Sequence, residues 1–120
     1  MIEGNYKHVD IHQLNEMADG NSAFISNLIQ MFFRQIPSFS EQLDSLLQQG
    51  NYYAIGKLAH KIKGSASMVG VTSLVGPMRE LESWAKQGVD SERCLKLISE
   101  FKNISGEAID ELTLILNDLD

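Results

Sequence analysis

The most informative stretch of this sequence is Gly56-Lys57-Leu58-Ala59-His60-Lys61-Ile62-Lys63-Gly64-Ser65-Ala66-Ser67-Met68-Val69-Gly70. At about 100° per residue, as in an α-helix, its apolar side chains fall within one stripe. That stripe consists of Ile55, Leu58, Ala59, Ile62, Ala66 and Val69. The pattern predicts a helix that buries the stripe in a core and leaves His60 facing water.

Small or charged residues share the helix face of His60. They are Gly56 at i−4, Lys63 at i+3, Gly64 at i+4 and Ser67 at i+7. Each glycine inside a helix costs about 1 kcal/mol relative to alanine. Because helical spacing continues through Gly56 and Gly64, neither is needed for a turn. We interpret both as open surface that lets a large partner approach His60 closely.

A histidine in this setting suits reversible phosphoryl transfer. A neutral imidazole has an unprotonated ring nitrogen that attacks phosphorus, and the phosphorylated nitrogen is a good leaving group for the next transfer. Lys63, and with it Lys57, would supply positive charge beside His60. An ammonium there stabilises the charge on the phosphoryl oxygens, which is the main help that this chemistry needs from a protein.

Helical spacing also dominates the rest of the chain, whose 120 residues suit one domain. We expect a short helix from about 10 to 18, and longer helices at about 21–50, 51–70, 72–88 and 91–119. Short connections make neighbouring helices antiparallel. The sequence therefore predicts an all-α fold over residues 1–120, an antiparallel up-down four-helix bundle with a short extra N-terminal helix.

Details of the long helices carry separate expectations. Pro37 lacks an N–H and clashes with the preceding turn, so it must kink or end its helix. We place Phe24 and Met31 of the same helix in its apolar stripe and hence in the core. The last helix should begin after Asp90 or Ser91.

Charge and composition exclude several classes of protein. The net charge of −6 argues against nucleic acid and anionic lipid as partners. No apolar run reaches the ~18 residues of a membrane span, and the N-terminus does not resemble a signal peptide. The single cysteine, Cys94, cannot form an internal disulfide, which fits a reducing compartment. We expect a cytoplasmic monomer, and the initial Met1 with a complete bundle favours a free protein.

The segment from Ala59 to Ala66 resembles the signature of histidine-containing phosphotransfer (HPt) domains, an Ala-His-x-Leu-Lys-Gly-Ser pattern followed by a further glycine. Gly70 fills that last place. Ile62 replaces the commoner leucine, a near-isosteric change in a core position. The resemblance covers most of the chain, from the 24–32 segment to the Leu81-Glu82 pair after the motif.

The resemblance implies that His60 is the phosphoacceptor, that Lys63 contacts the phosphoryl group or a partner, and that Gly64 leaves room for the partner. The predicted partner-binding residues are Gly56, Lys57, Gly64, Ser67 and Met68. In some members of the family a polar side chain on the following helix contacts the histidine ring. Glu82 is the candidate for that contact here.

The partners that the resemblance implies are receiver domains of response regulators and an upstream hybrid sensor histidine kinase. A receiver exchanges the phosphoryl group through an aspartate with a magnesium ion, and both belong to the receiver. The resemblance thus implies no cofactor and no metal site in this chain. Because the chain has no room for an ATP-binding kinase domain, it would relay a phosphoryl group and not generate one.

Other interpretations remain beside this one. A non-catalytic helical adaptor for a receiver or kinase would be expected to lack the histidine, and His60 is present. A metal-binding or enzymatic bundle needs inward Glu and His pairs, whereas the predicted interior is apolar. His8 and His12 lie four residues apart, as zinc ligands sometimes do, but two ligands make no site. We expect both histidines to be solvated.

Overall fold

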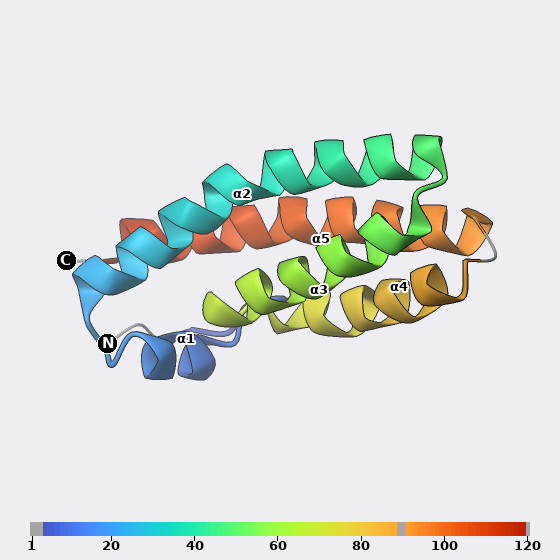
Figure 1. Cartoon of the computed structure of the whole chain (residues 1–120). Coiled ribbons are helices and arrows are strands. Elements are labelled where there is room, and N and C mark those ends of the chain that lie inside the picture. The colour runs from blue at the N-terminus through green and yellow to red at the C-terminus, as the bar shows by residue number, and fades with distance from the viewer. Residues whose placement is uncertain (1–3, 89–90, 120) are drawn as a thin grey trace.

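A computed structural model of the chain describes residues 4–88 and 91–119. Its elements are α1 (Ile11–Met17), α2 (Ser22–Gln49), α3 (Tyr52–Met68), the 3₁₀ helix η1 (Thr72–Leu74), α4 (Val75–Gln87) and α5 (Ser91–Asn117). Successive helices from α2 to α5 run in opposite directions, and α1 lies near one end of the bundle (Figure 1). The predicted all-α, up-down bundle with an extra N-terminal helix is confirmed. The predicted cap Asp90 lies outside the described residues.

The four long helices enclose one core. α2 packs against α3 and α5, and α4 packs against the same two helices, so the four form a closed ring. The molecule is elongated, measuring 46 × 20 × 19 Å. The largest fully buried side chains are Phe32, Phe101, Leu14, Ile25, Ile29, Leu43, Ile55, Ile62, Leu74, Met78, Leu81 and Ile98. Each α-helix of the described residues contributes to this set, so α1 belongs to the same core.

Helix α2 continues through Pro37 and bends partway along its length (Figure 1). Pro37 is exposed, so water can hydrate the carbonyl that loses its intrahelical partner. The buried Ile36 and Phe39 on either side hold the two halves of α2 against the core. Our placement of Phe24 and Met31 in the core was wrong, because both are about half exposed. The apolar stripe that the sequence predicts for α2 is wider than the helix face that the neighbouring helices cover.

The N-terminal segment, residues 4–10, docks on the turn that follows α3. The backbone N–H of Asp10 donates to the carbonyl of Gly70 at 2.7 Å, and Val9 forms an isolated antiparallel bridge with Val71. Gly70 has φ of +71°, and a Cβ there would lie 2.7 Å from the Asp10 carbonyl oxygen. Only glycine combines this left-handed backbone with so close an approach of another chain segment.

A second anchor of the N-terminal segment is His8, which is only 5% exposed. Its Nε2 lies 2.7 Å from the Glu107 carboxylate, and Glu111 accepts the backbone N–H groups of His8 and Val9 at 3.0 and 3.2 Å. The prediction of a solvated His8 was therefore wrong, because two glutamates one turn apart on α5 provide its partners. His12 is exposed as expected and lies 3.3 Å from Glu16.

We predict that Gly70→Ala lowers the free energy of unfolding by about 1–3 kcal/mol, because alanine is strained at positive φ and its Cβ meets the Asp10 carbonyl. The control is Gly106→Ala in α5, where a Cβ would meet nothing within 4 Å. That variant should gain up to about 1 kcal/mol. Urea unfolding followed by circular dichroism measures both. A Gly70→Ala protein as stable as the wild type would contradict the docking argument.

Candidate functional site

His60 lies in the middle of α3 with its side chain 67% exposed. The start of this helix is fixed by Gly50, whose φ of +68° ends α2, and by Asn51, whose side chain accepts the N–H of Ala54. The opposite face of α3 buries Ile55, Leu58, Ala59, Ile62 and Ala66. The predicted orientation of His60 toward water is confirmed.

Glu82 on α4 joins the ring of His60 to the ammonium of Lys63. The Nδ1 atom of His60 lies 3.2 Å from one oxygen of the carboxylate and 3.4 Å from the other. Lys63 Nζ donates to the same carboxylate at 3.4 Å. The side chains of Glu82 and Lys63 are each 23% exposed, so their contact sits at the edge of the α3–α4 interface.

The pKa of the Glu82 carboxyl reflects opposing effects. Partial burial raises the pKa, but hydrogen bonds from His60 and Lys63 and the charge of Lys63 outweigh it, so the pKa falls below its ordinary value of 4.5. The carboxylate is therefore ionised at neutral pH and only accepts hydrogen bonds. Nδ1 of His60 must carry the hydrogen in this contact, and Nε2 of the neutral ring keeps a free lone pair.

The two glycines beside His60 differ in their surroundings. Gly64 is exposed, and a Cβ there would meet nothing within 4 Å, so the expected open surface exists at this position. Gly56 is buried, and a Cβ there would lie 3.6 Å from the Cβ of Ala85 and 3.7 Å from the carbonyl of Glu82. Our interpretation of Gly56 as open surface was wrong, because α4 packs directly over it.

The other predicted partner-binding residues lie along the same helix. Lys57 is exposed, and its Nζ lies 5.1 Å from the centroid of the Tyr53 ring. Ser67 is half-buried, and its hydroxyl donates to the carbonyl of Lys63 at 3.0 Å. Met68 is exposed at the end of α3. Binding of a partner to these residues stays a prediction.

A hollow of about 500 Å³ opens between α3 and α4 beside His60. It is lined by Tyr52, Tyr53, Gly56, Lys57, His60, Glu82, Ala85, Lys86 and Gly88. Tyr53 and Lys86 line this hollow but were not among the predicted partner-binding residues. Tyr53 lies seven residues before His60, hence on the same helix face, so extending the face by two turns toward the N-terminus would have found it.

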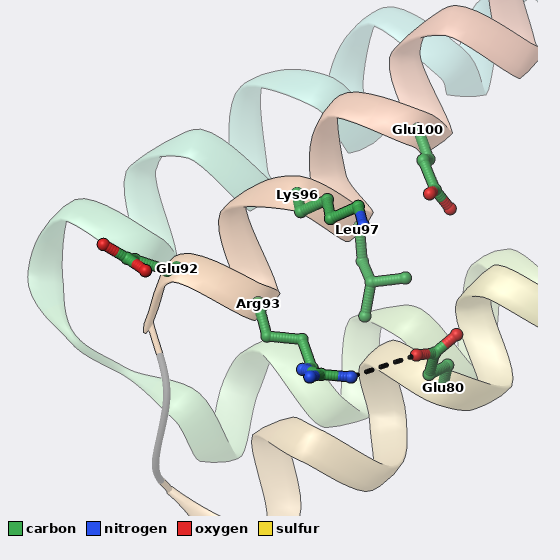
Figure 2. A pocket seen from close by; sticks show the side chains of 6 residues that line it. All are labelled: Glu80, Glu92, Arg93, Lys96, Leu97 and Glu100. Atoms are coloured by element: carbon green, nitrogen blue, oxygen red, sulfur yellow. Dashed lines mark ion pairs between the residues drawn. The ribbon is translucent and has the colours of Figure 1, made fainter.

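A second hollow, of about 420 Å³, lies between α4 and α5 (Figure 2). It is lined by Glu80, Glu92, Arg93, Lys96, Leu97 and Glu100. The Arg93 guanidinium reaches from α5 to 3.9 Å from the Glu80 carboxylate and lies 4.4 Å from the centroid of the Trp84 ring. None of the described lining side chains is a histidine, a cysteine or a serine, so we place the candidate chemistry at the α3–α4 hollow, which His60 lines.

In residues 4–88 and 91–119, no three side chains of His, Cys, Asp or Glu gather closely enough to hold a metal ion. Among the helices of the same residues, none is long and apolar enough to cross a membrane.

The family model of the Hpt domain matches residues 27–120. This range contains α3 with His60 and α4 with Glu82, whereas the N-terminal segment and α1 precede it. Curated proteins and solved structures give no significant match to the chain.

The lowered pKa of Glu82 predicts how stability depends on pH. Ionised Glu82 should stabilise the fold fully above about pH 4.5, and this contribution should be lost as the pH falls through the lowered pKa of the folded state. The difference in unfolding free energy between the wild type and Glu82→Gln should therefore shrink as the pH falls below about 4.5.

Carbon-13 NMR of the Glu82 carboxyl measures the same effect directly. We expect a midpoint below 4.5 in the wild type and a higher midpoint in Lys63→Met, which removes one hydrogen bond and one charge. A wild-type midpoint at or above 4.5 would show that Glu82 does not form these contacts in solution.

Proposed function

The chain belongs to the Hpt domain family, whose members act in histidine phosphotransfer in two-component phosphorelays, and we propose that it carries the phosphoryl group on Nε2 of His60. In this proposal it exchanges that group with an aspartate of response-regulator receiver domains. The observation that supports it most is the exposed His60 ring, whose Nδ1 is held by Glu82 while Nε2 is left free. An exposed ring with a fixed tautomer is ready to attack a phosphorus atom on another protein.

The proposed transfer step uses one atom of this chain as the nucleophile. The lone pair of Nε2 attacks the phosphorus of an aspartyl phosphate on the receiver. The N–P bond forms as the P–O bond to the aspartate breaks, and the aspartate leaves as a carboxylate. Nδ1 keeps its hydrogen, so positive charge develops on the ring. The Glu82 carboxylate, 3.2 Å from Nδ1, stabilises that charge.

Lys63 has two roles in this proposal. In the unphosphorylated protein its ammonium pairs with Glu82 at 3.4 Å. Because Lys63 lies one turn after His60 on α3, its flexible side chain can move from Glu82 to the oxygens of the transferring phosphoryl group. An ammonium there stabilises the charge of a loose transition state, which depends on electrostatics more than on covalent help.

The partner would supply the remaining parts of the reaction. We place the phosphoaccepting aspartate and its magnesium ion on the receiver, and we assign no cofactor and no ATP-dependent kinase activity to this chain. Domains of the Hpt family act as phosphotransfer carriers and not as kinases. The upstream donor would be a hybrid sensor histidine kinase. The cytoplasmic location and the monomeric state stay predictions.

His60→Gln should abolish uptake of labelled phosphoryl groups from a panel of phosphorylated receiver domains. The variant should keep its fold, because the side chain is 67% exposed. In the wild type the label should be lost in acid and survive in alkali, as a phosphorus–nitrogen bond requires. Uptake by His60→Gln, or an acid-stable label on the wild type, would rule out His60 as the carrier. A wild type that binds a receiver but takes up no label would favour a non-catalytic adaptor.

Gly64→Gln should slow transfer from a receiver while raising the free energy of unfolding by up to about 1 kcal/mol, because the longer side chain fills open surface and glutamine favours helix. Gly106→Gln on α5 is the matched control, since its site is equally open and it should gain stability without slowing transfer. If Gly64→Gln transferred as fast as the control, the space beside His60 would not be needed by the partner.

A further inference from the structure

The hollow beside His60 extends well beyond the atoms that the transfer step uses. We propose that the part bounded by Tyr53, Lys57, Ala85 and Lys86 is a specificity subsite, which receives an apolar side chain of the receiver domain flanked by acidic residues of the same partner. This inference rests on the proposed function, because it takes a receiver domain as the occupant. It adds the residues that select among receivers.

The shape of the subsite comes from small residues at the contact of α3 with α4. Gly56 and Ala85 line its floor, and the place of a Gly56 Cβ lies only 3.6 Å from the Cβ of Ala85. Neither residue projects into the hollow. Tyr53 stands beside this floor and is 75% exposed. Covering such an aromatic ring with an apolar side chain removes a large apolar area from water.

The charge around the subsite points to an acidic partner. Lys57 and Lys86 are exposed and line the hollow, although the whole chain has a net charge of −6. Among the described residues that line the hollow, Glu82 is the one carboxylate, and it is engaged with His60 and Lys63. The surface is therefore locally basic on an acidic protein. Acidic residues of a receiver that flank the apolar side chain would complement the charge of these two lysines.

The position of the subsite makes it part of the same contact as the transfer step. His60 itself lines the hollow, so a partner that places its aspartate over Nε2 also covers Tyr53 and Lys57. Both residues lie on the N-terminal side of His60, whereas Lys63 lies on the C-terminal side. Contacts at the subsite should therefore change the affinity for a receiver more than the rate of the chemical step.

The first test measures kcat and KM for transfer from a phosphorylated receiver that labels the wild type. Tyr53→Ala should raise KM about tenfold, as loss of a buried aromatic contact does, with kcat changed by less than about twofold. Tyr53→Phe keeps the ring and should keep the wild-type KM. Leu114→Ala is the control for an exposed apolar side chain, 58% exposed on α5, and should leave both constants unchanged.

The second test concerns charge. Lys86→Ala should raise KM about threefold at low salt and less at high salt, because exposed charges steer association and are screened by ions. Lys96→Ala, which removes an exposed lysine of the α4–α5 hollow, should leave KM unchanged. If the two variants changed KM equally, the effect would come from the net charge of the chain and not from the position of Lys86. That result would overturn the subsite.

A third test maps the contact without a substitution. Titrating the nitrogen-15-labelled chain with the unphosphorylated receiver should shift the amide resonances of Tyr53, Lys57 and Ala85 with those around His60. Shifts confined to α2 and α5 would overturn the subsite. The same shifts on concentrating the chain alone would assign the hollow to a second copy of this protein and would also overturn it.

The outcomes separate this inference from the proposed function. If wild-type protein accepts no label from any receiver, both fail. If the wild type is labelled on His60 but Tyr53→Ala, with an unchanged amide spectrum, keeps the wild-type KM, the subsite is wrong and the phosphotransfer function stands.

Discussion

The close packing of α3 against α4 is the constraint on which the candidate site depends. Gly56 has no side chain, and the Cβ of Ala85 and the carbonyl of Glu82 lie within 4 Å of the place where its Cβ would be. This approach brings the Glu82 side chain from α4 to within 3.2 Å of the ring of His60. The glycine that the sequence suggested as open surface thus lies inside the helix contact that holds the histidine, where a Cβ would make ordinary van der Waals contacts.

The ion pairs around Glu82 matter more for the chemistry of the candidate site than for the stability of the fold. Ion pairs with exposed partners contribute about 0–1 kcal/mol, and the His60 ring is 67% exposed. Yet in the proposed transfer the same carboxylate fixes which ring nitrogen carries hydrogen and faces the charge that would develop on phosphorylation of the other nitrogen. It also keeps Lys63 beside the ring in the unphosphorylated protein. A small energetic effect therefore has a large effect on which atom can react.

Helical periodicity predicted the features that each helix determines by itself. It gave the order of the helices, the buried face of α3 and the exposure of His60. Helical periodicity failed where the burial of a residue depends on which other segment packs against it. His8 is buried at a contact with Glu107 and Glu111 on α5. These glutamates lie about a hundred positions away in the sequence, so no local pattern predicts the contact. Tyr53 was missed for a simpler reason, since the face of His60 was followed toward the C-terminus for two turns and toward the N-terminus for one.

The structure also divides the motif into residues with different tasks. His60 and Gly64 face open space, where a partner can reach them. Gly70, the last glycine of the pattern, is instead covered by Asp10 and cannot take part in docking. The Gln13 side chain of α1 adds a hydrogen bond of 2.8 Å to the carbonyl of Ser67, so the end of α3 is held by residues that precede the family match. The packing of the His60 helix at that end thus depends on a part of the chain that the motif itself does not include.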